Sequence, residues 1–220
     1  MNKIDDFLRN LGYYTIGGVD EAGRGSLAGP VVAACVVLDY DNIPLGIKDS
    51  KKLTNRQRRG LSVDIKNSAV GYGWGIVHSF TIDDINILES TKMAMKMAII
   101  CAQEDLAKYD RILDYVMVDA VRLDWLFLNV RTISFVYGED KSLAVAAASI
   151  LAKVIRDDHM IDMNHHFPGY DFDKNKGYPT REHIKGLLKH GPCEIHRRSY
   201  RPVKEACDNG SQLVSKTSGP

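Results

Sequence analysis

The sequence predicts an α/β fold in which helices flank a mixed β-sheet, because strand-like and helix-like segments alternate along its 220 residues. Two observations support this. The runs 14–19 and 31–38 are apolar or β-branched and are bounded by Gly or Pro, which is typical of strands. The segment 81–108 keeps apolar residues at a 3.6-residue period over many turns, which indicates a long helix.

The other elements follow from the same patterns. Leu61, Ile65 and Ala69 recur at four-residue spacing, so we expect a helix over 54–67, with Thr54 as its N-cap. The remaining expected elements are strands over 70–77, 115–118 and 131–136 and a helix over 142–165.

The length of the chain suits one domain, which we expect to cover residues 1–203. A helical C-terminal part is expected from about residue 167. The segment 204–220 has no periodicity and is expected to be a mobile tail.

Nothing in the sequence points to a membrane or to a disulfide framework. The longest apolar runs are shorter than the roughly 20 residues that span a bilayer, and the acidic N-terminus does not resemble a secretory signal, so we expect a cytoplasmic protein. The four cysteines lack C-x-x-C spacing, so we expect them to be reduced and not to bind zinc.

Positive charge is concentrated in two segments although the net charge is only +1. Residues 174–204 contain nine Lys or Arg and two acids, and residues 48–59 contain six Lys or Arg and one Asp. Such clusters favour a polyanionic partner such as nucleic acid, and the alternative is an ordinary solvated face.

Acidic residues stand where three of the predicted strands end. These residues are Asp20 and Glu21, Asp119, and Glu139 with Asp140. Strand ends are where α/β folds build their sites, and clustered carboxylates favour binding of Mg²⁺ or Mn²⁺. The alternative is that these acids only end strands and cap loops. Neighbouring residues of a strand point to opposite faces, so a metal shared by Asp20 and Glu21 would require the strand to break there.

The loop after the first acidic pair is rich in glycine. Gly23, Arg24 and Gly25 do not suit a dinucleotide fingerprint, because a strand rather than a helix follows. Close approach of the loop backbone to a sugar-phosphate chain is the better hypothesis, with an ordinary tight turn as the alternative.

Taken together, these segments resemble the ribonuclease HII family, and they look like its bacterial branch. The resemblance rests on the following runs: GVDEAGRG at 18–25, LAGPVVAA at 27–34, DSKKLT at 49–54, VDA at 118–120, KS at 141–142, AAASILAKV at 146–154, KGYPT at 176–180 and HRRS at 196–199.

The resemblance implies a ribonuclease H-like mixed five-stranded sheet flanked by helices, with a small helical C-terminal extension, in a monomer. It implies a two-metal endonuclease that hydrolyses RNA in RNA/DNA hybrids and nicks duplex DNA 5′ of embedded ribonucleotides, leaving 3′-hydroxyl and 5′-phosphate ends. The implied cofactor is Mn²⁺ or Mg²⁺. The implied residues are Asp20, Glu21 and Asp119 as metal-binding catalytic acids, and Gly23, Arg24, Gly25, Ser50, Lys51 and Tyr178 as substrate contacts.

One position departs from the family pattern, which usually has Lys-Gly-Asp shortly before its Lys-Ser pair, whereas this chain reads YGEDKS at 137–142. Counting back from Ser149 aligns Glu139 with the fourth catalytic acid, and Asp140 is the alternative. If this change had inactivated the site, the chain would be a hybrid-binding module without catalysis. A nicotinamide oxidoreductase is a third hypothesis, which the glycine loop alone suggests. The three histidines 183, 190 and 196 are expected to be hydrogen-bonding or exposed residues outside the site.

Overall fold

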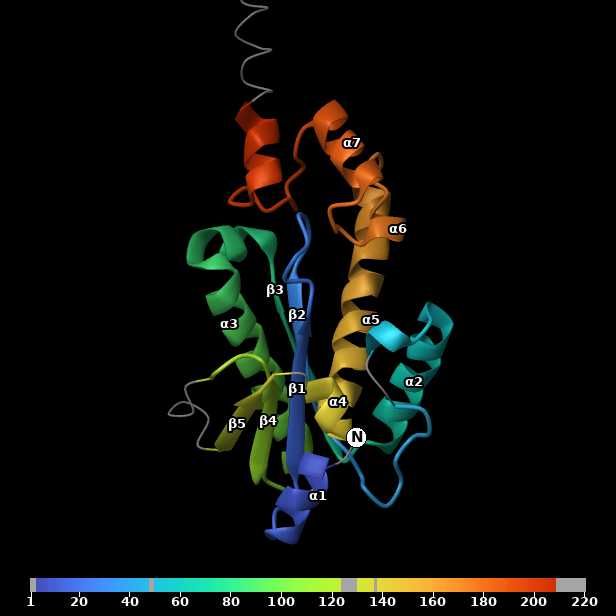
Figure 1. Ribbon diagram of the computed structural model, residues 1–220, viewed down its shortest axis with the longest axis vertical. Helices are drawn as coiled ribbons and strands as arrows, with labels where there is room; N and C mark the ends of the chain where they lie inside the picture. The colour runs from blue at the N-terminus through green and yellow to red at the C-terminus, as the bar shows by residue number, and fades with distance from the viewer. Residues whose placement is uncertain (1–2, 48–49, 124–129, 137, 209–220) are drawn as a thin grey trace, which may run out of the picture. The chain divides into compact units, whose positions relative to one another are not determined.

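The computed structural model describes residues 3–47, 50–123, 130–136 and 138–208 (Figure 1). The chain forms two compact units. Unit 1 consists of Met1–Ala22, Val32–Ile76 and Thr91–Ile155. Unit 2 consists of Gly23–Val31, Val77–Ser90 and Arg156–Pro220. The expected single domain over 1–203, with a helical part from about residue 167, stays a prediction.

A five-stranded sheet forms the centre of unit 1, in the order β3-β2-β1-β4-β5. Its strands are β1 (Ile16–Ala22), β2 (Val31–Val37), β3 (Gly71–Val77), β4 (Tyr115–Asp119) and β5 (Arg131–Phe135). β1 is antiparallel to β2 and parallel to β4, which is in turn parallel to β5, so the expected mixed sheet is confirmed.

β1 does not break at its acidic pair, which corrects the expectation from sequence. Asp20 pairs with Ala34 and Glu21 with Ala33, and the antiparallel ladder continues to Ala22. The strand ends only where Gly23 takes a φ of +98°, a conformation that glycine adopts without strain. Regular pairing with β2 therefore outweighs the tendency of the following glycines to interrupt the strand.

The helices of unit 1 that cover the sheet or lie beside it include α1 (Lys3–Asn10), α2 (Asn55–Ser68), the part of α3 (Ser79–Ala107) from Thr91 onward and the first part of α5 (Leu143–His166). α2 begins after Thr54, whose hydroxyl accepts from the Gln57 N–H while the Gln57 side chain accepts from the Thr54 N–H. α5 runs close to β1, because a Cβ at Gly18 would lie 2.1 Å from the Ala144 carbonyl carbon.

α3 (Ser79–Ala107) is the helix expected over 81–108, with one bend that its periodicity does not reveal. Asn86 has non-helical dihedral angles, φ 68° and ψ 166°. Its side-chain oxygen accepts from the N–H groups of Leu88 and Glu89, so Asn86 acts as a cap in the middle of the predicted helix.

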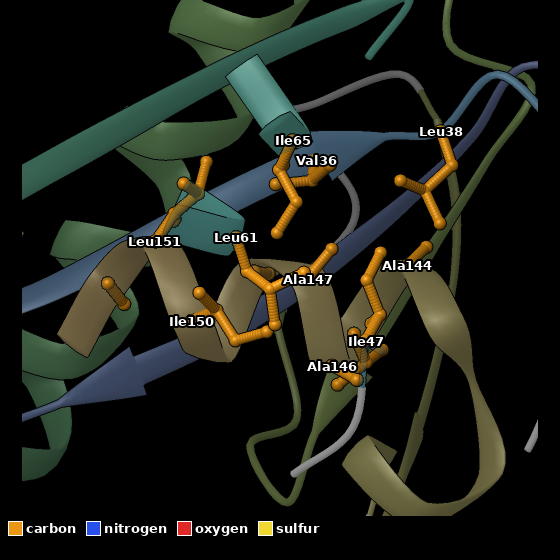
Figure 2. Close-up of a cluster of buried hydrophobic side chains, with 14 of the residues drawn as sticks. Val36, Leu38, Ile47, Leu61, Ile65, Ala144, Ala146, Ala147, Ile150 and Leu151 are labelled. Carbon is orange, nitrogen blue, oxygen red and sulfur yellow. The ribbon is translucent and has the colours of Figure 1, made fainter. Parts of the chain in front are cut away.

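The core of unit 1 lies where α2 and α5 meet β1 and β2. Figure 2 shows Leu61 and Ile65 of α2 beside Ala147, Ile150 and Leu151 of α5. The small side chains of the alanine-rich run in α5 let the helix pack closely against the strands that carry the acids.

Unit 2 contains two short helices, α6 (Phe172–Asn175) and α7 (Arg181–His190), and a further helix over 201–208. Val203 and Ala206 are buried against Leu27 and Leu187. The tail boundary expected at residue 204 is therefore too early, because residues 204–208 are helical. Residues 209–220 lie outside the described part. In the described ranges, no helix is long and apolar enough to cross a membrane.

Candidate active site

Asp20 is a buried carboxyl group in the middle of an acidic cluster. The residue is 6% exposed, and burial raises its pKa well above the ordinary value, with further increases from the charges of Glu21 and Asp119. The Glu21 N–H donates to Asp20 Oδ1 at 2.7 Å, which stabilises the ionised form in part. Glu21 and Asp119 therefore lie close enough for their charges to act on Asp20.

Asp119 reaches the same edge of the sheet as Asp20 because β4 runs parallel to β1. Val19 pairs with Val118, so the residue that follows each of them continues toward the same end of the sheet. Asp119 Oδ1 accepts from the Gly138 N–H at 2.7 Å. This bond ties the carboxylate to the start of α4 (Gly138–Lys141), the element that contains the other two acids expected from sequence.

The two candidates for the fourth acid differ in what the structure describes. Asp140 is exposed, and its Oδ1 accepts from Lys52 Nζ at 2.7 Å. This contact lowers the pKa of Asp140. Glu139 lies in α4, but its side chain is outside the described part of the chain.

Ser149 on α5 links the acids to the first basic segment and was not expected in the site. It is 6% exposed and hydrogen-bonds to Asp20, which lowers the pKa of that carboxyl group. Its Oγ lies 2.8 Å from Ser50 Oγ, so Ser50 is positioned through Ser149. Lys51 follows in the 3-10 turn Ser50–Lys52 and is exposed. Only the match of Ser149 to a family motif marked it in the sequence.

The donor set suits a hard divalent cation. Carboxylate oxygens are the ligands that Mg²⁺ and Mn²⁺ prefer, and a cation would offset the charge repulsion that raises the pKa of Asp20. Among the described side chains, however, no group of three or more His, Cys, Asp or Glu is arranged to hold a metal ion. The assignment of individual metal ligands therefore stays a prediction.

In unit 2, the glycine loop is held by Arg197, which is fully buried. Its guanidinium donates to the carbonyls of Gly23 at 2.7 Å, Arg24 at 2.8 Å and Gly29 at 3.0 Å. The hydroxyl of Tyr200 donates to the same Arg24 carbonyl at 2.7 Å. The loop backbone is thus fixed from within unit 2.

A second buried guanidinium, that of Arg156, joins this loop to Tyr178. It donates to the carbonyls of Ala28, Pro30 and Lys176, and it lies 5.3 Å from the centre of the Tyr178 ring. A Cβ at Gly23 would come within 2.0 Å of Arg156 Nε. Burial lowers the pKa of Arg156 to about 10, so the side chain stays charged at neutral pH.

The loop and the segment before Tyr178 are also hydrogen-bonded directly. The N–H groups of Leu27 and Ala28 both donate to the Gly177 carbonyl. The structure therefore connects the loop that contains Gly23, Arg24 and Gly25 to the segment of Tyr178 in unit 2. In unit 1, Asp20 interacts with Glu21, with Asp119 and, through Ser149, with Ser50. Sequence reasoning did not single out the two buried arginines, whose charge resembles that of any residue in the basic segments.

Comparisons with known proteins give the same family as the motifs. Residues 17–203 match the family model described as Ribonuclease HII. A protein named Ribonuclease HII from Caldanaerobacter subterraneus subsp. tengcongensis is 48% identical over 200 residues, covering 91% of this chain and 79% of that protein. The crystal structure of the ribonuclease H2 from Pyrococcus horikoshii superposes with a TM-score of 0.71 at 24% identity, covering 90% of this chain and 99% of that one. Bst-RNase HIII in complex with Mn²⁺ superposes with a TM-score of 0.65 at 18% identity, covering 93% and 72%.

The fold and the acidic strand ends define a metal-dependent endoribonuclease of the ribonuclease H-like class. Within that class, the chain belongs to the ribonuclease HII family. The family's activity is cleavage of RNA in RNA/DNA hybrids and nicking at ribonucleotides embedded in DNA, so the function expected from the resemblance is confirmed.

Proposed function

We propose that this chain cuts on the 5′ side of a ribonucleotide within duplex DNA, and within RNA/DNA hybrids, leaving 3′-hydroxyl and 5′-phosphate ends. The observation that carries the proposal is the cluster of Asp20, Glu21 and Asp119, in which burial and mutual repulsion raise the pKa of Asp20. Such a cluster is costly to the fold unless a cation binds there.

Asp20, Glu21 and Asp119 would hold the cation, with Glu139 as the fourth acid. β1 stays regular at Asp20 and Glu21, but the charge of Glu21 acts on Asp20, which favours a shared site without a break in the strand. Two divalent ions at such a site supply an activated water and stabilisation of the leaving oxygen. The pairing of Asp140 with Lys52 favours Glu139, because a carboxylate engaged by an ammonium group is less available as a metal ligand. The preferred ion is Mn²⁺ or Mg²⁺, and the relative Bst-RNase HIII binds Mn²⁺.

Gly23, Arg24 and Gly25 would contact the ribose and its phosphates, and Tyr178 would stack at the junction between RNA and DNA. Backbone groups of a fixed glycine loop can recognise a 2′-hydroxyl, which is the group that distinguishes RNA from DNA. The rigid support of this loop by Arg197 favours such a role, because a fixed backbone discriminates between ligands that differ by one hydroxyl group. Ser50 and Lys51 would contact phosphates. We also propose a monomer that acts in the cytoplasm.

The test uses a labelled DNA duplex with one ribonucleotide and a matched all-DNA duplex, each with Mg²⁺, Mn²⁺ or EDTA. We expect metal-dependent cutting 5′ to the ribonucleotide, no cutting of the all-DNA duplex, and loss of cutting in Asp20→Asn. Tight binding of the duplex without cutting under any of the metal conditions would instead support a binding module that lacks catalysis.

A further inference from the structure

A pair of buried histidines in unit 2 lies next to Tyr178 and has no part in the proposed chemistry. His183 of α7 is 0% exposed and His196 is 1% exposed, and their Nε2 atoms lie 3.1 Å apart. His183 Nδ1 lies 2.9 Å from the Tyr178 carbonyl oxygen, and His196 Nδ1 lies 3.0 Å from the Cys193 backbone nitrogen. The pair therefore connects the backbone at Cys193 to the backbone at Tyr178.

The two outer contacts fix the proton on each ring. A carbonyl oxygen only accepts, so His183 Nδ1 must carry a hydrogen, and a backbone N–H only donates, so His196 Nδ1 must be bare. A neutral imidazole has a single N–H, so in His196 it is on Nε2 and donates to the bare Nε2 of His183. The three hydrogen bonds run in one direction and require both rings to be neutral.

The surroundings favour the neutral rings. Tyr170 and Phe172 pack against the pair, with the Tyr170 ring 4.9 Å from His196 and the Phe172 ring 5.3 Å from His183. Burial lowers the pKa of both histidines. Among the described residues, the titratable or charged groups that face the pair are Tyr170, Cys193 and Arg198.

The chain of hydrogen bonds ends at Tyr178, the residue that we propose stacks on the substrate. The Tyr178 carbonyl accepts both from His183 Nδ1 and from the Thr180 N–H, at 2.9 and 2.8 Å, so both of its acceptor positions are filled. The backbone of Tyr178 is thus held by α7 while its ring lies against Arg156.

We propose that His183 and His196 are positioning residues that fix Tyr178 for binding of the ribonucleotide-containing duplex. This inference rests on the role of Tyr178 in the proposed function. Neither histidine touches the substrate, and each acts only through the backbone of Tyr178.

The experiment is a double-mutant cycle that measures KM and kcat on the single-ribonucleotide duplex. His183→Leu removes the donor to the Tyr178 carbonyl and is expected to raise KM about tenfold, which corresponds to roughly one lost hydrogen bond, with less effect on kcat. In the Tyr178→Ala background, the same change is expected to have little further effect. His183→Asn, whose side-chain nitrogen can still donate to the carbonyl, is expected to recover most of the loss.

The matched control is His190→Leu, because His190 is an exposed histidine at the end of the same helix. We expect its KM to equal that of the wild type. An equal effect of His183→Leu with and without Tyr178→Ala would overturn the positioning role and leave the role of Tyr178 intact. A wild-type KM in Tyr178→Ala alone would overturn both. Thermal unfolding of every variant shows whether a loss of activity comes from global instability. Such instability would lower the unfolding midpoint in both backgrounds and would likewise contradict the inference.

Discussion

Lys52 donates from Nζ to Asp140 Oδ1 at 2.7 Å, an exposed pair that joins the first basic segment to the short helix α4. The contact bears on the fourth catalytic acid, because it engages one of the two neighbouring candidates and lowers its pKa. Exposed ion pairs contribute little to stability, so the loss of Asp140 has little reason to disturb the fold.

We therefore expect Asp140→Ala to cut the ribonucleotide duplex within about threefold of the wild-type rate, since the pair is exposed. We expect Glu139→Ala to lose at least about a hundredfold in kcat, the usual effect of removing one group that stabilises charge in the transition state. Single-turnover cleavage of the two variants side by side measures this. The reverse order of activities would assign the fourth carboxylate to Asp140.

The variant Asp20→Asn separates the contribution of the acidic cluster to cleavage from its effect on the free energy of unfolding. Because the pKa of Asp20 is raised in the folded protein, the ionised group destabilises the fold at neutral pH, and stability increases as the pH falls through the folded pKa toward the ordinary value of 3.8. Replacing the charge with an amide should abolish cleavage and raise the unfolding midpoint by roughly a few degrees in metal-free buffer.

The same variant tests the cation. Mn²⁺ should raise the unfolding midpoint of the wild type and change that of Asp20→Asn much less, because the ion binds only the folded cluster. Scanning calorimetry with Mn²⁺ and with EDTA measures both midpoints. Equal stabilisation of the two proteins by Mn²⁺ would show that Asp20 is not a ligand.

Two glycines of the glycine loop differ in their tolerance of a side chain. Gly23 has a φ of +98° and a Cβ there would lie 2.0 Å from Arg156 Nε, whereas a Cβ at Gly25 would meet no atom within 4 Å. We expect Gly23→Ala to lower the free energy of unfolding by about 1–3 kcal/mol and Gly25→Ala to change it by less than about 0.5 kcal/mol. Urea denaturation compares them, and equal losses would contradict the packing of Arg156 against Gly23.

Much of the fold could be predicted from local pattern, and the misses share a cause. The strands and the long helices follow the periods of apolar residues, so their positions hold to within a few residues. The cap at Asn86 is local, with Leu88 and Glu89 as partners, but it interrupts an otherwise unbroken period of apolar residues. The capping of α5 by Asp5, which accepts from the Leu143 N–H at 3.2 Å, joins residues far apart in the sequence. No period marks such positions.

The candidate site shows the same division. Asp20, Glu21 and Asp119 could be found because each stands at the end of a strand, and the structure brings them to one edge of the sheet. Ser149 and Arg156 could not be assigned roles from pattern, because a serine or an arginine on an apolar helix acquires its role only from what it contacts. The continuation of β1 through the acidic pair likewise depends on its pairing with β2.

The last prediction concerns stability at low pH. Burial, followed by the electrostatic interaction with His183, lowers the pKa of His196 from 6.5 to about 4 in the folded protein. The unfolded chain therefore binds a proton below about pH 6.5 that the folded protein does not bind until about pH 4. The contribution of His196 to stability is complete above the unfolded pKa and is lost as the pH falls toward the folded pKa.

Between about pH 7 and pH 5 this linkage amounts to about 2 kcal/mol. The variant His196→Asn keeps an acceptor for the Cys193 N–H but does not titrate, so its unfolding free energy should fall by about 2 kcal/mol less than that of the wild type over the same range. Urea denaturation of both proteins at several pH values gives the two slopes. Carboxyl groups titrate in both proteins, so their contribution cancels when the two slopes are compared. Parallel profiles of unfolding free energy against pH would mean that His196 is protonated as easily in the folded protein as in the unfolded chain.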